Sequence, residues 1–117
     1  MLAQLNTYEL QALMAHDPQF IGVFALDELP HNLPMDKTIK LIVNLQPKSQ
    51  PGSHWVAIYR RGNNGFYFDT FGRLPPSTIR NWLANNTRRW KFYDKIIQAP
   101  SDKVSCGYIC LTFLKRL

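Results

Sequence analysis

The sequence predicts an α+β fold, a small mixed sheet with an antiparallel hairpin packed on a buried C-terminal helix. Aromatic and β-branched runs flank RGNNG (residues 61–65), whose Asn and Gly residues tolerate positive φ, so this segment is expected to form a hairpin. Residues 105–117 are apolar almost all round, which is typical of a buried helix. With 117 residues, 45% of them hydrophobic, the chain fits one domain, residues 1–117, with its own core.

The first half of the chain contains one helix pattern followed by strand patterns. Asn6 with Glu9 three positions later resembles a capping box, and apolar residues then recur at helical spacing, which predicts a helix from Thr7 to Ala15. The patterns beyond it predict, in order, a strand or extended segment at residues 20–30, a loop at 31–34, a central strand at 38–45 and a connector at 46–53.

The second half begins with the hairpin, residues 54–72. A helix within residues 75–90 is expected to be capped by Ser77 or Thr78, and residues 90–98 have the pattern of another strand. In the last helix we expect Ser105 as N-cap, which puts Cys106 at the first helical position. The residues expected in the core are Ile42, Val56, Ile58, Phe68, Trp82, Leu111 and Leu114.

The apolar runs and the cysteines limit the class of protein. Every apolar run falls well short of the ~20 residues that cross a bilayer, and the N-terminus lacks a secretion signal, so we expect a soluble protein kept inside a cell. Cys106 and Cys110 are four residues apart in one predicted helix, where a disulfide would stabilise little. We therefore expect two free thiols in a reducing compartment and no structural zinc or other metal.

The net charge of +6 favours polyanions as neighbours. Basic residues gather modestly at Arg60 and Arg61, and more clearly in TRRWKFYDK (residues 87–95) around Trp90. This mixture could grip phosphates without sequence preference, but it contains no groove-reading motif. A solvated surface is an equally good interpretation.

The hairpin makes a geometric prediction about His54 and Asp69. His54 begins the first strand and Asp69 ends the second, and antiparallel strands joined by a short turn bring those ends together. An aspartate beside a histidine fixes its tautomer and stabilises the imidazolium, as in the orienting half of a catalytic triad. Taken alone, such a pair is more often two ordinary surface residues.

Cys106 supplies a second constraint, from the start of the last helix. Free N–H groups and the helix dipole favour a thiolate there, and a protonated histidine nearby would favour it further. Gly107 is expected to leave space beside the sulfur for a substrate backbone. The alternative, a small buried apolar residue, is the interpretation that we give to Cys110, one turn further along the helix.

Gln98 is the fourth candidate site residue. It lies eight residues before Cys106, and the intervening loop could fold it back toward the start of the last helix. Its amide and the backbone N–H of Cys106 could then form an oxyanion hole for acyl transfer. A lone glutamine is usually just solvated, so the prediction depends on the other three residues.

These pieces, in this order, resemble the adenain family, the adenovirus maturation endopeptidases and their relatives in virophages and self-synthesising transposons. The matching segments are GSHWVAIY, YFDTFG, QAPSDKVSCGYIC and FLKRL, with YELQALMAHDPQFIGVFALDELP resembling the family's N-terminal helix and strand. The similarity covers nearly the whole chain. The more distant ubiquitin-like-protein proteases share the same order of residues and are the nearest alternative.

The resemblance implies a cysteine endopeptidase with an adenain-like core. Cys106 would be the nucleophile, His54 the general base and then acid, Asp69 its orienting group, and Gln98 part of the oxyanion hole. Trp55 and Gly107 would lie at the substrate-binding site, although core packing is the first role that we expect of Trp55. The substrates implied are viral precursor proteins cut at glycine-containing sites, because a narrow channel at the sulfur admits only small side chains.

Further properties are implied by the resemblance. No cofactor is required, although adenain is stimulated by DNA and by a short viral peptide that attaches through a disulfide. The basic surface permits the first, whereas neither cysteine is an obvious anchor for the second. We expect a monomer that acts on protein or peptide substrates inside the virion and the host cell, in the nucleus or a cytoplasmic virus factory, with no membrane partner.

The chain departs from adenain at three points. Adenain has an acid one carbon longer at the position of Asp69, where the ubiquitin-like-protein proteases have aspartate. The loop from Gln98 to Cys106 is one residue longer. The chain also ends directly after the last helix, so we expect a minimal core or a shortened chain. The alternatives to a viral endopeptidase are a protease of ubiquitin-like modifiers and a non-catalytic basic nucleic-acid-binding domain.

Overall fold

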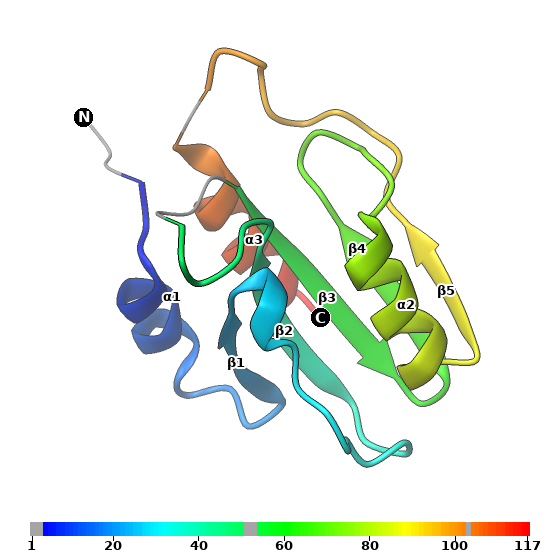
Figure 1. Cartoon of the computed structure of the whole chain (residues 1–117). Helices are drawn as coiled ribbons and strands as arrows, with labels where there is room; N and C mark the ends of the chain where they lie inside the picture. Colours follow the sequence, from blue (N-terminus) through cyan, green and yellow to red (C-terminus); the bar gives the residue numbers. More distant parts are fainter. Residues whose placement is uncertain (1–3, 51–53, 103) are drawn as a thin grey trace.

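The computed structural model describes residues 4–50, 54–102 and 104–117. Its helices and strands are interspersed along the chain, with β2, β3 and β4 in direct succession (Figure 1). They are α1 (Thr7–Met14), β1 (Phe20–Phe24), the short 3-10 helix η1 (Leu26–Glu28), β2 (Ile39–Asn44), β3 (Trp55–Arg61), β4 (Asn64–Phe68), α2 (Ser77–Asn86), β5 (Arg89–Phe92) and α3 (Ser105–Lys115).

The sheet is mixed, with strand order β1-β2-β3-β4-β5. The antiparallel pairs β2–β3 and β3–β4 form its centre, and β1 and β5 join the two edges as parallel strands. The β3–β4 hairpin turns at Gly62, where φ is +58°, as the RGNNG segment predicted. The predicted α+β class with a mixed sheet is confirmed.

Two apolar cores lie on the two faces of the sheet. Along β3 the side chains alternate, so Trp55 and Ala57 pack with α1 and α3, whereas Val56 and Ile58 pack with α2. Figure 1 shows α2 in front of the sheet and α3 behind it. All residues expected in the core are buried, namely Ile42, Val56, Ile58, Phe68, Trp82, Leu111 and Leu114.

The helix starts differ in part from the expectation. Asn6 and Glu9 form the predicted capping box on α1, and this helix ends one residue before Ala15. The predicted caps of α2 are wrong, because the helix begins at Ser77 and Pro76 occupies the N-cap position without a side-chain bond. A proline that precedes the first turn already holds an extended backbone, so no side-chain cap is needed to set the direction of entry.

The start of α3 is also one residue earlier than expected. Val104 holds the N-cap position, so Ser105 is the first helical residue and Cys106 the second. The carboxylate of Asp102 accepts the N–H groups of Val104 and Ser105 at 2.9 and 3.1 Å. Asp102 therefore caps α3 in place of the predicted Ser105, because its Oδ1 accepts both N–H groups at the start of the helix.

The segment predicted as the last strand, residues 90–98, is strand only in its first part, because β5 ends at Phe92. Beyond that point the chain leaves the sheet edge and follows the turn after β4. The N–H groups of Ile97 and Gln98 donate to the carbonyl of Thr70, at 2.8 and 3.2 Å. This departure carries Gln98 toward the end of the hairpin.

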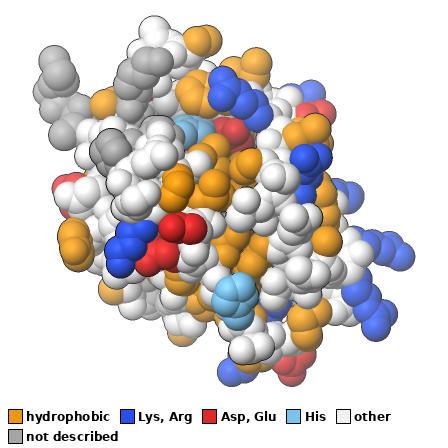
Figure 2. All heavy atoms as spheres, viewed as in Figure 1, with side chains coloured by type: hydrophobic (Ala, Val, Ile, Leu, Met, Phe, Trp, Pro, Cys, Tyr) orange, Lys and Arg blue, Asp and Glu red, His pale blue; other side chains and the backbone are white. Residues whose placement is uncertain are grey.

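The basic surface is smaller than the sequence suggested. Arg60 is fully buried and donates to the backbone carbonyls of Pro34, Lys37 and Asn86, so it is no part of a basic patch. Arg61 and the basic residues of segment 87–95 are exposed. Figure 2 shows Lys and Arg side chains projecting at the edge of the molecule that carries β5 and α2. Within the described ranges, no helix is long and apolar enough to cross a bilayer.

Candidate active site

Three elements meet at one end of the β3–β4 hairpin. His54 immediately precedes β3, Asp69 immediately follows β4, and Cys106 lies in the first turn of α3, which packs against β3. The hairpin brings its two ends together, and the helix behind the sheet adds a sulfur to them. Residues 15 and 52 positions apart in the chain thus form one cluster.

The imidazole of His54 is held by a buried carboxylate. Its Nε2 lies 2.6 Å from Oδ1 of Asp69, which is 1% exposed. The same oxygen accepts the N–H of Phe71 at 3.0 Å. The predicted proximity of His54 and Asp69 is therefore present, and the carboxylate is fixed by the backbone two residues further on. This geometry leaves the other ring nitrogen, Nδ1, for a different partner.

The thiol of Cys106 forms a side-chain hydrogen bond with the same imidazole. Burial by itself would raise the pKa of the Cys106 thiol. The bond to His54, the backbone N–H groups near Trp55 and Gly107, and the charge of the imidazolium outweigh burial, so the pKa of Cys106 lies below its ordinary value. The sulfur is therefore poised to ionise.

The imidazole shifts in the complementary direction. Burial alone would lower the pKa of His54, but the hydrogen bonds to Asp69 and Cys106 and their negative charges raise it to about 9. A lowered thiol pKa beside a raised imidazole pKa favours the proton on the ring. The two shifts therefore favour an ion pair of thiolate and imidazolium over the neutral pair of thiol and imidazole.

Cys110 has the opposite environment, although it lies one turn away on the same helix. It is 0% exposed, and its thiol lies 3.5 Å from the carbonyl oxygen of Trp55. Burial raises the pKa of Cys110 well above its ordinary value, and the negative charges nearby add to this rise. Both cysteines are free thiols, as expected, but only Cys106 has an ionising partner.

Gln98 is buried, and its side-chain amide is hydrogen-bonded at both ends. Its Oε1 accepts a hydrogen bond from the hydroxyl of Thr70, and its Nε2 donates to the carbonyl of Asp102 at 2.7 Å. Asp102 also caps α3, so a single residue joins Gln98 to the helix that carries Cys106. An amide nitrogen has two hydrogens, and the bond to Asp102 uses one of them.

Trp55 and Gly107 fit together as packing partners. The indole N–H of Trp55 donates to the carbonyl of Leu5 at 3.0 Å, and the side chain is buried. A Cβ on Gly107 would lie 3.3 Å from Cδ1 of Trp55 and 3.4 Å from Cβ of Leu5. The space beside Gly107 is thus filled by protein, which differs from the expectation that it would admit a substrate backbone.

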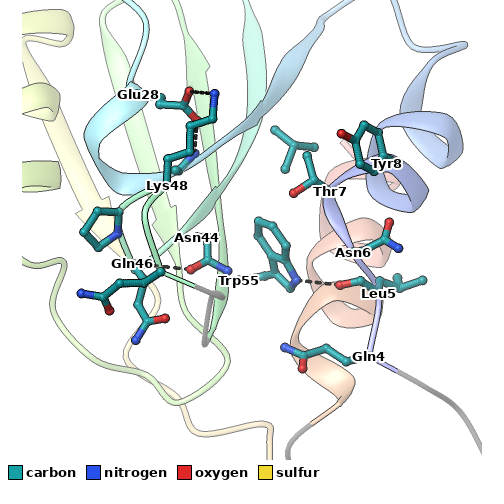
Figure 3. Close-up of a pocket in the computed structure, with 14 residues that line it drawn as sticks. Gln4, Leu5, Asn6, Thr7, Tyr8, Glu28, Asn44, Gln46, Lys48 and Trp55 are labelled. Carbon is teal, nitrogen blue, oxygen red and sulfur yellow. Dashed lines mark hydrogen bonds and ion pairs between the residues drawn. The ribbon is translucent and has the colours of Figure 1, made fainter.

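A cleft of about 480 Å³ opens next to Trp55 (Figure 3). One wall is the segment Gln4–Tyr8, and the other contains the end of β2 and the residues after it. In Figure 3, Trp55 lies between these walls and the Glu28–Lys48 ion pair lies on the far side of the cleft from Leu5. The remaining lining is mostly uncharged and polar, with the side chains of Gln4, Asn6, Thr7, Asn44, Gln46 and Gln50.

The sequence analysis missed three residues that hold this site together. They are Thr70, which orients the Gln98 amide, Phe71, which stacks on His54, and Asp102, which caps α3. Asp102 had a signal, because an acid three residues before Ser105 is a capping residue in its own right. The contacts of Thr70 and Phe71 depend on folding and had no local signal. In the part of the chain that the structure covers, no cluster of His, Cys, Asp and Glu could hold a metal ion.

Solved structures provide the comparison that defines the fold. The chain matches a crystal structure of the ASFV pS273R protease over 97% of its length, with a TM-score of 0.66 and 16% sequence identity. This chain has the fold of that protease. A selenomethionine crystal structure of the same protease gives a TM-score of 0.64 at 15% identity, again over 97% of this chain.

The similarity to the solved protease structures is limited in the length covered and in sequence. This chain spans 57% of the length of each solved protease chain. The sequence matches no protein-family model and no curated protein. The comparison therefore establishes the fold, and the chemistry has to be argued from the residues at the end of the hairpin.

Proposed function

We propose that this protein is a cysteine endopeptidase with Cys106 as nucleophile, His54 as general base and acid, and Asp69 as the group that orients His54. One observation carries the proposal: the side chain of His54 interacts with the Cys106 thiol and also binds the buried carboxylate of Asp69 through Nε2. The fold shared with the ASFV pS273R protease supports it independently. Neither Cys110 nor any surface feature is needed for this chemistry.

The reaction follows from the thiolate–imidazolium pair. The sulfur of Cys106 attacks the carbonyl carbon of the scissile bond and forms a C–S bond, while the carbonyl oxygen takes the negative charge. The imidazolium of His54 then gives its proton to the leaving amine as the C–N bond breaks. Neutral His54 next removes a proton from water, which attacks the thioester and releases the acid and the thiolate. Asp69 stabilises the imidazolium at each stage at which it forms.

Charge on the carbonyl oxygen needs hydrogen-bond donors already in place. The backbone N–H of Cys106 is one candidate, because the first N–H groups of a helix have no partner within it. The amide of Gln98 is the second, through the hydrogen that Asp102 does not bind. Two fixed donors in a buried site would stabilise the tetrahedral intermediate without any rearrangement during the reaction.

The cleft beside Trp55 is the proposed binding site for the acyl side of an extended peptide. Its polar lining suits backbone amides, and Trp55 at its end directly follows His54 in the chain. Because Cys106 is 1% exposed, a residue with little or no side chain would bring its carbonyl closest to the sulfur. This supports cleavage after glycine.

The proposed substrates are viral precursor proteins that are cut during virion maturation. The fold of a viral protease and the order of site residues shared with the adenain family support this class. We accordingly place the activity in the virion and the infected cell. The exposed basic residues near β5 leave room for stimulation by DNA, which remains part of the proposal.

A peptide panel tests the proposed activity. We expect the protein to cleave peptides with glycine before the scissile bond, and to leave matched peptides with leucine there intact. Cys106→Ala should abolish cleavage, whereas Cys110→Ala should keep it. Cleavage of a ubiquitin-like fusion in preference to every peptide would favour the alternative, a protease of ubiquitin-like modifiers. Cleavage that survives Cys106→Ala would refute the assignment.

A further inference from the structure

We propose that Phe71 is a positioning residue for His54, and that its ring fixes the plane of the imidazole so that Nδ1 stays directed at Cys106. This inference rests on the proposed function, which it deepens. The ring centroids of His54 and Phe71 are 4.8 Å apart, with an angle of 27° between the planes. The backbone N–H of Phe71 also binds Oδ1 of Asp69, the oxygen that binds His54. Phe71 thus contacts the base and the acid at once.

A stacked ring supplies a restraint that the carboxylate cannot. A single hydrogen bond at Nε2 leaves the imidazole free to swing about the line joining Nε2 to Oδ1. Contact along one face of the ring removes that freedom, because tilting the imidazole would drive it into Phe71. The face of an aromatic ring is also negative, so the stack favours the imidazolium over the neutral ring.

Phe71 is itself held firmly. It lies in a four-residue turn, because the N–H of Gly72 donates to the carbonyl of Asp69 at 2.8 Å. The guanidinium of Arg73 lies over its ring, with Cζ 4.9 Å from the centroid. Phe71 is half-buried and belongs to neither apolar core of the described residues. Its apolar contact is therefore used at the site and not in the general packing of the fold.

Substitutions at position 71 separate positioning from plain packing. In the Cys110→Ala background, we expect Phe71→Ala and Phe71→Leu to slow alkylation of Cys106 by iodoacetamide near neutral pH about two- to twelvefold, the range set by the energy of one aromatic pair. Phe71→Tyr should react at the wild-type rate. Leucine keeps the apolar volume, so this variant remains informative if Phe71→Ala fails to fold. Phe66→Ala, which removes a stacked ring from Tyr59 elsewhere on the hairpin, is the matched control and should react normally.

NMR spectra of the same proteins measure the stack directly. The ring current of Phe71 should shift the carbon-bound ring protons of His54 upfield, and Phe71→Leu should remove the shift while Phe71→Tyr keeps it. Wild-type alkylation rates in a folded Phe71→Leu protein, or unshifted His54 protons in the wild type, would overturn the role of Phe71. Neither readout requires peptide cleavage. A wild-type protein that cleaves no peptide but shows both effects would therefore refute the proposed function and leave the positioning role standing.

Discussion

At the scale of single residues, the two cysteines of α3 show how strongly the surroundings of a thiol determine its pKa. Cys106 and Cys110 are equally buried, at 1% and 0% exposure, and neither is in a disulfide. What separates them is the imidazole of His54 and the backbone hydrogen bonds that Cys106 forms with Trp55 and Gly107. Burial without such partners raises the pKa of a thiol, whereas a hydrogen-bonded imidazole beside the thiol lowers it.

This contrast predicts a pH dependence that can be measured with one thiol at a time. The lowered pKa of Cys106 means that its thiolate, and hence its alkylation, appears at a lower pH than for an ordinary thiol. The raised pKa of His54 keeps the imidazolium in place up to about pH 9, where a second change in rate should follow. At pH 7 the Cys110→Ala protein should react at least about tenfold faster than the Cys106→Ala protein.

The Cys110→Ala and Cys106→Ala proteins each retain one buried cysteine. Comparing them therefore controls for the access of the alkylating agent to the thiol. Replacing His54 by Ala in the Cys110→Ala background should move the alkylation profile of Cys106 up toward that of an ordinary thiol. Equal rates in the two single-cysteine proteins at pH 7 would contradict an activated Cys106.

At the scale of elements, the turn after β4 organises the site. Asp69 orients His54, Thr70 binds both the backbone and the side chain of Gln98, and Phe71 stacks on the imidazole. The turn can do this because Gly72 adopts φ +67° and lies directly against the backbone of Lys95. Four consecutive residues therefore connect the hairpin to the segment that leads into α3.

Alanine substitutions at Gly72 and Gly62 isolate the contact between the turn after β4 and the backbone of Lys95. Both Gly72 and Gly62 have left-handed φ, so Gly62→Ala should cost about 1 kcal/mol of unfolding free energy from backbone strain alone. A Cβ at Gly62 meets nothing within 4 Å, whereas at Gly72 it would lie 2.8 Å from the carbonyl oxygen of Lys95. Gly72→Ala should therefore cost about 1–3 kcal/mol more, measured by urea unfolding.

The activity of the two variants gives a second comparison. Gly72→Ala should also lower peptide cleavage, because pushing residue 95 away displaces Gln98 from Thr70. Gly62→Ala, at the opposite end of the hairpin, should leave cleavage unchanged. Equal losses of stability in both variants would mean that the turn and segment 94–98 do not depend on each other.

At the scale of the whole molecule, one sheet with an apolar core on each face supports a site at a single end. The core behind the sheet holds α3 and so places Cys106, while the core in front holds α2. Arg60 joins the parts around the front core, since its guanidinium binds the loop carbonyls of Pro34 and Lys37 and the carbonyl of Asn86 at the end of α2.

Replacing Arg60 by Ala should be strongly destabilising. The change would remove a fully buried side chain and the donor of three part-buried backbone carbonyls, a loss of about 2–5 kcal/mol in unfolding free energy. Its neighbour Arg61 is exposed, so Arg61→Ala should stay within about 0.5 kcal/mol of the parent protein. Thermal or urea unfolding of the Arg60→Ala and Arg61→Ala proteins measures the difference in unfolding free energy. A similar small loss in both variants would show that Arg60 is dispensable for the fold.

Much of the fold could be predicted because the signals were local. The RGNNG turn fixed the hairpin, and the hairpin placed His54 beside Asp69. The alternation of side chains on β3 is a further local signal, since Arg60 follows Val56 and Ile58 on the same face and is buried with them. The sequence interpretation placed Arg60 on the surface because the residue is charged, although the alternation along the strand puts it on a buried face.

The remaining details depend on contacts between distant parts of the chain. The partner of Gln98 is Thr70, 28 residues away, and only the departure of segment 93–98 from the sheet edge brings the two together. Gly107 was expected to face a substrate, yet the folded protein puts Trp55 and Leu5 against it. Neither contact leaves a pattern in the sequence, because the residues involved lie on different elements.

The most direct test is to trap the covalent intermediate. The protein is mixed with a peptide ester ending in glycine, the reaction is stopped with acid, and the adduct is located by mass spectrometry of the digested protein. We predict a thioester on Cys106 that is present in Cys110→Ala and strongly reduced in His54→Ala. An acyl group on any other residue, or on Cys106 in equal amounts with and without His54, would contradict the assignment of this site as a cysteine peptidase centre.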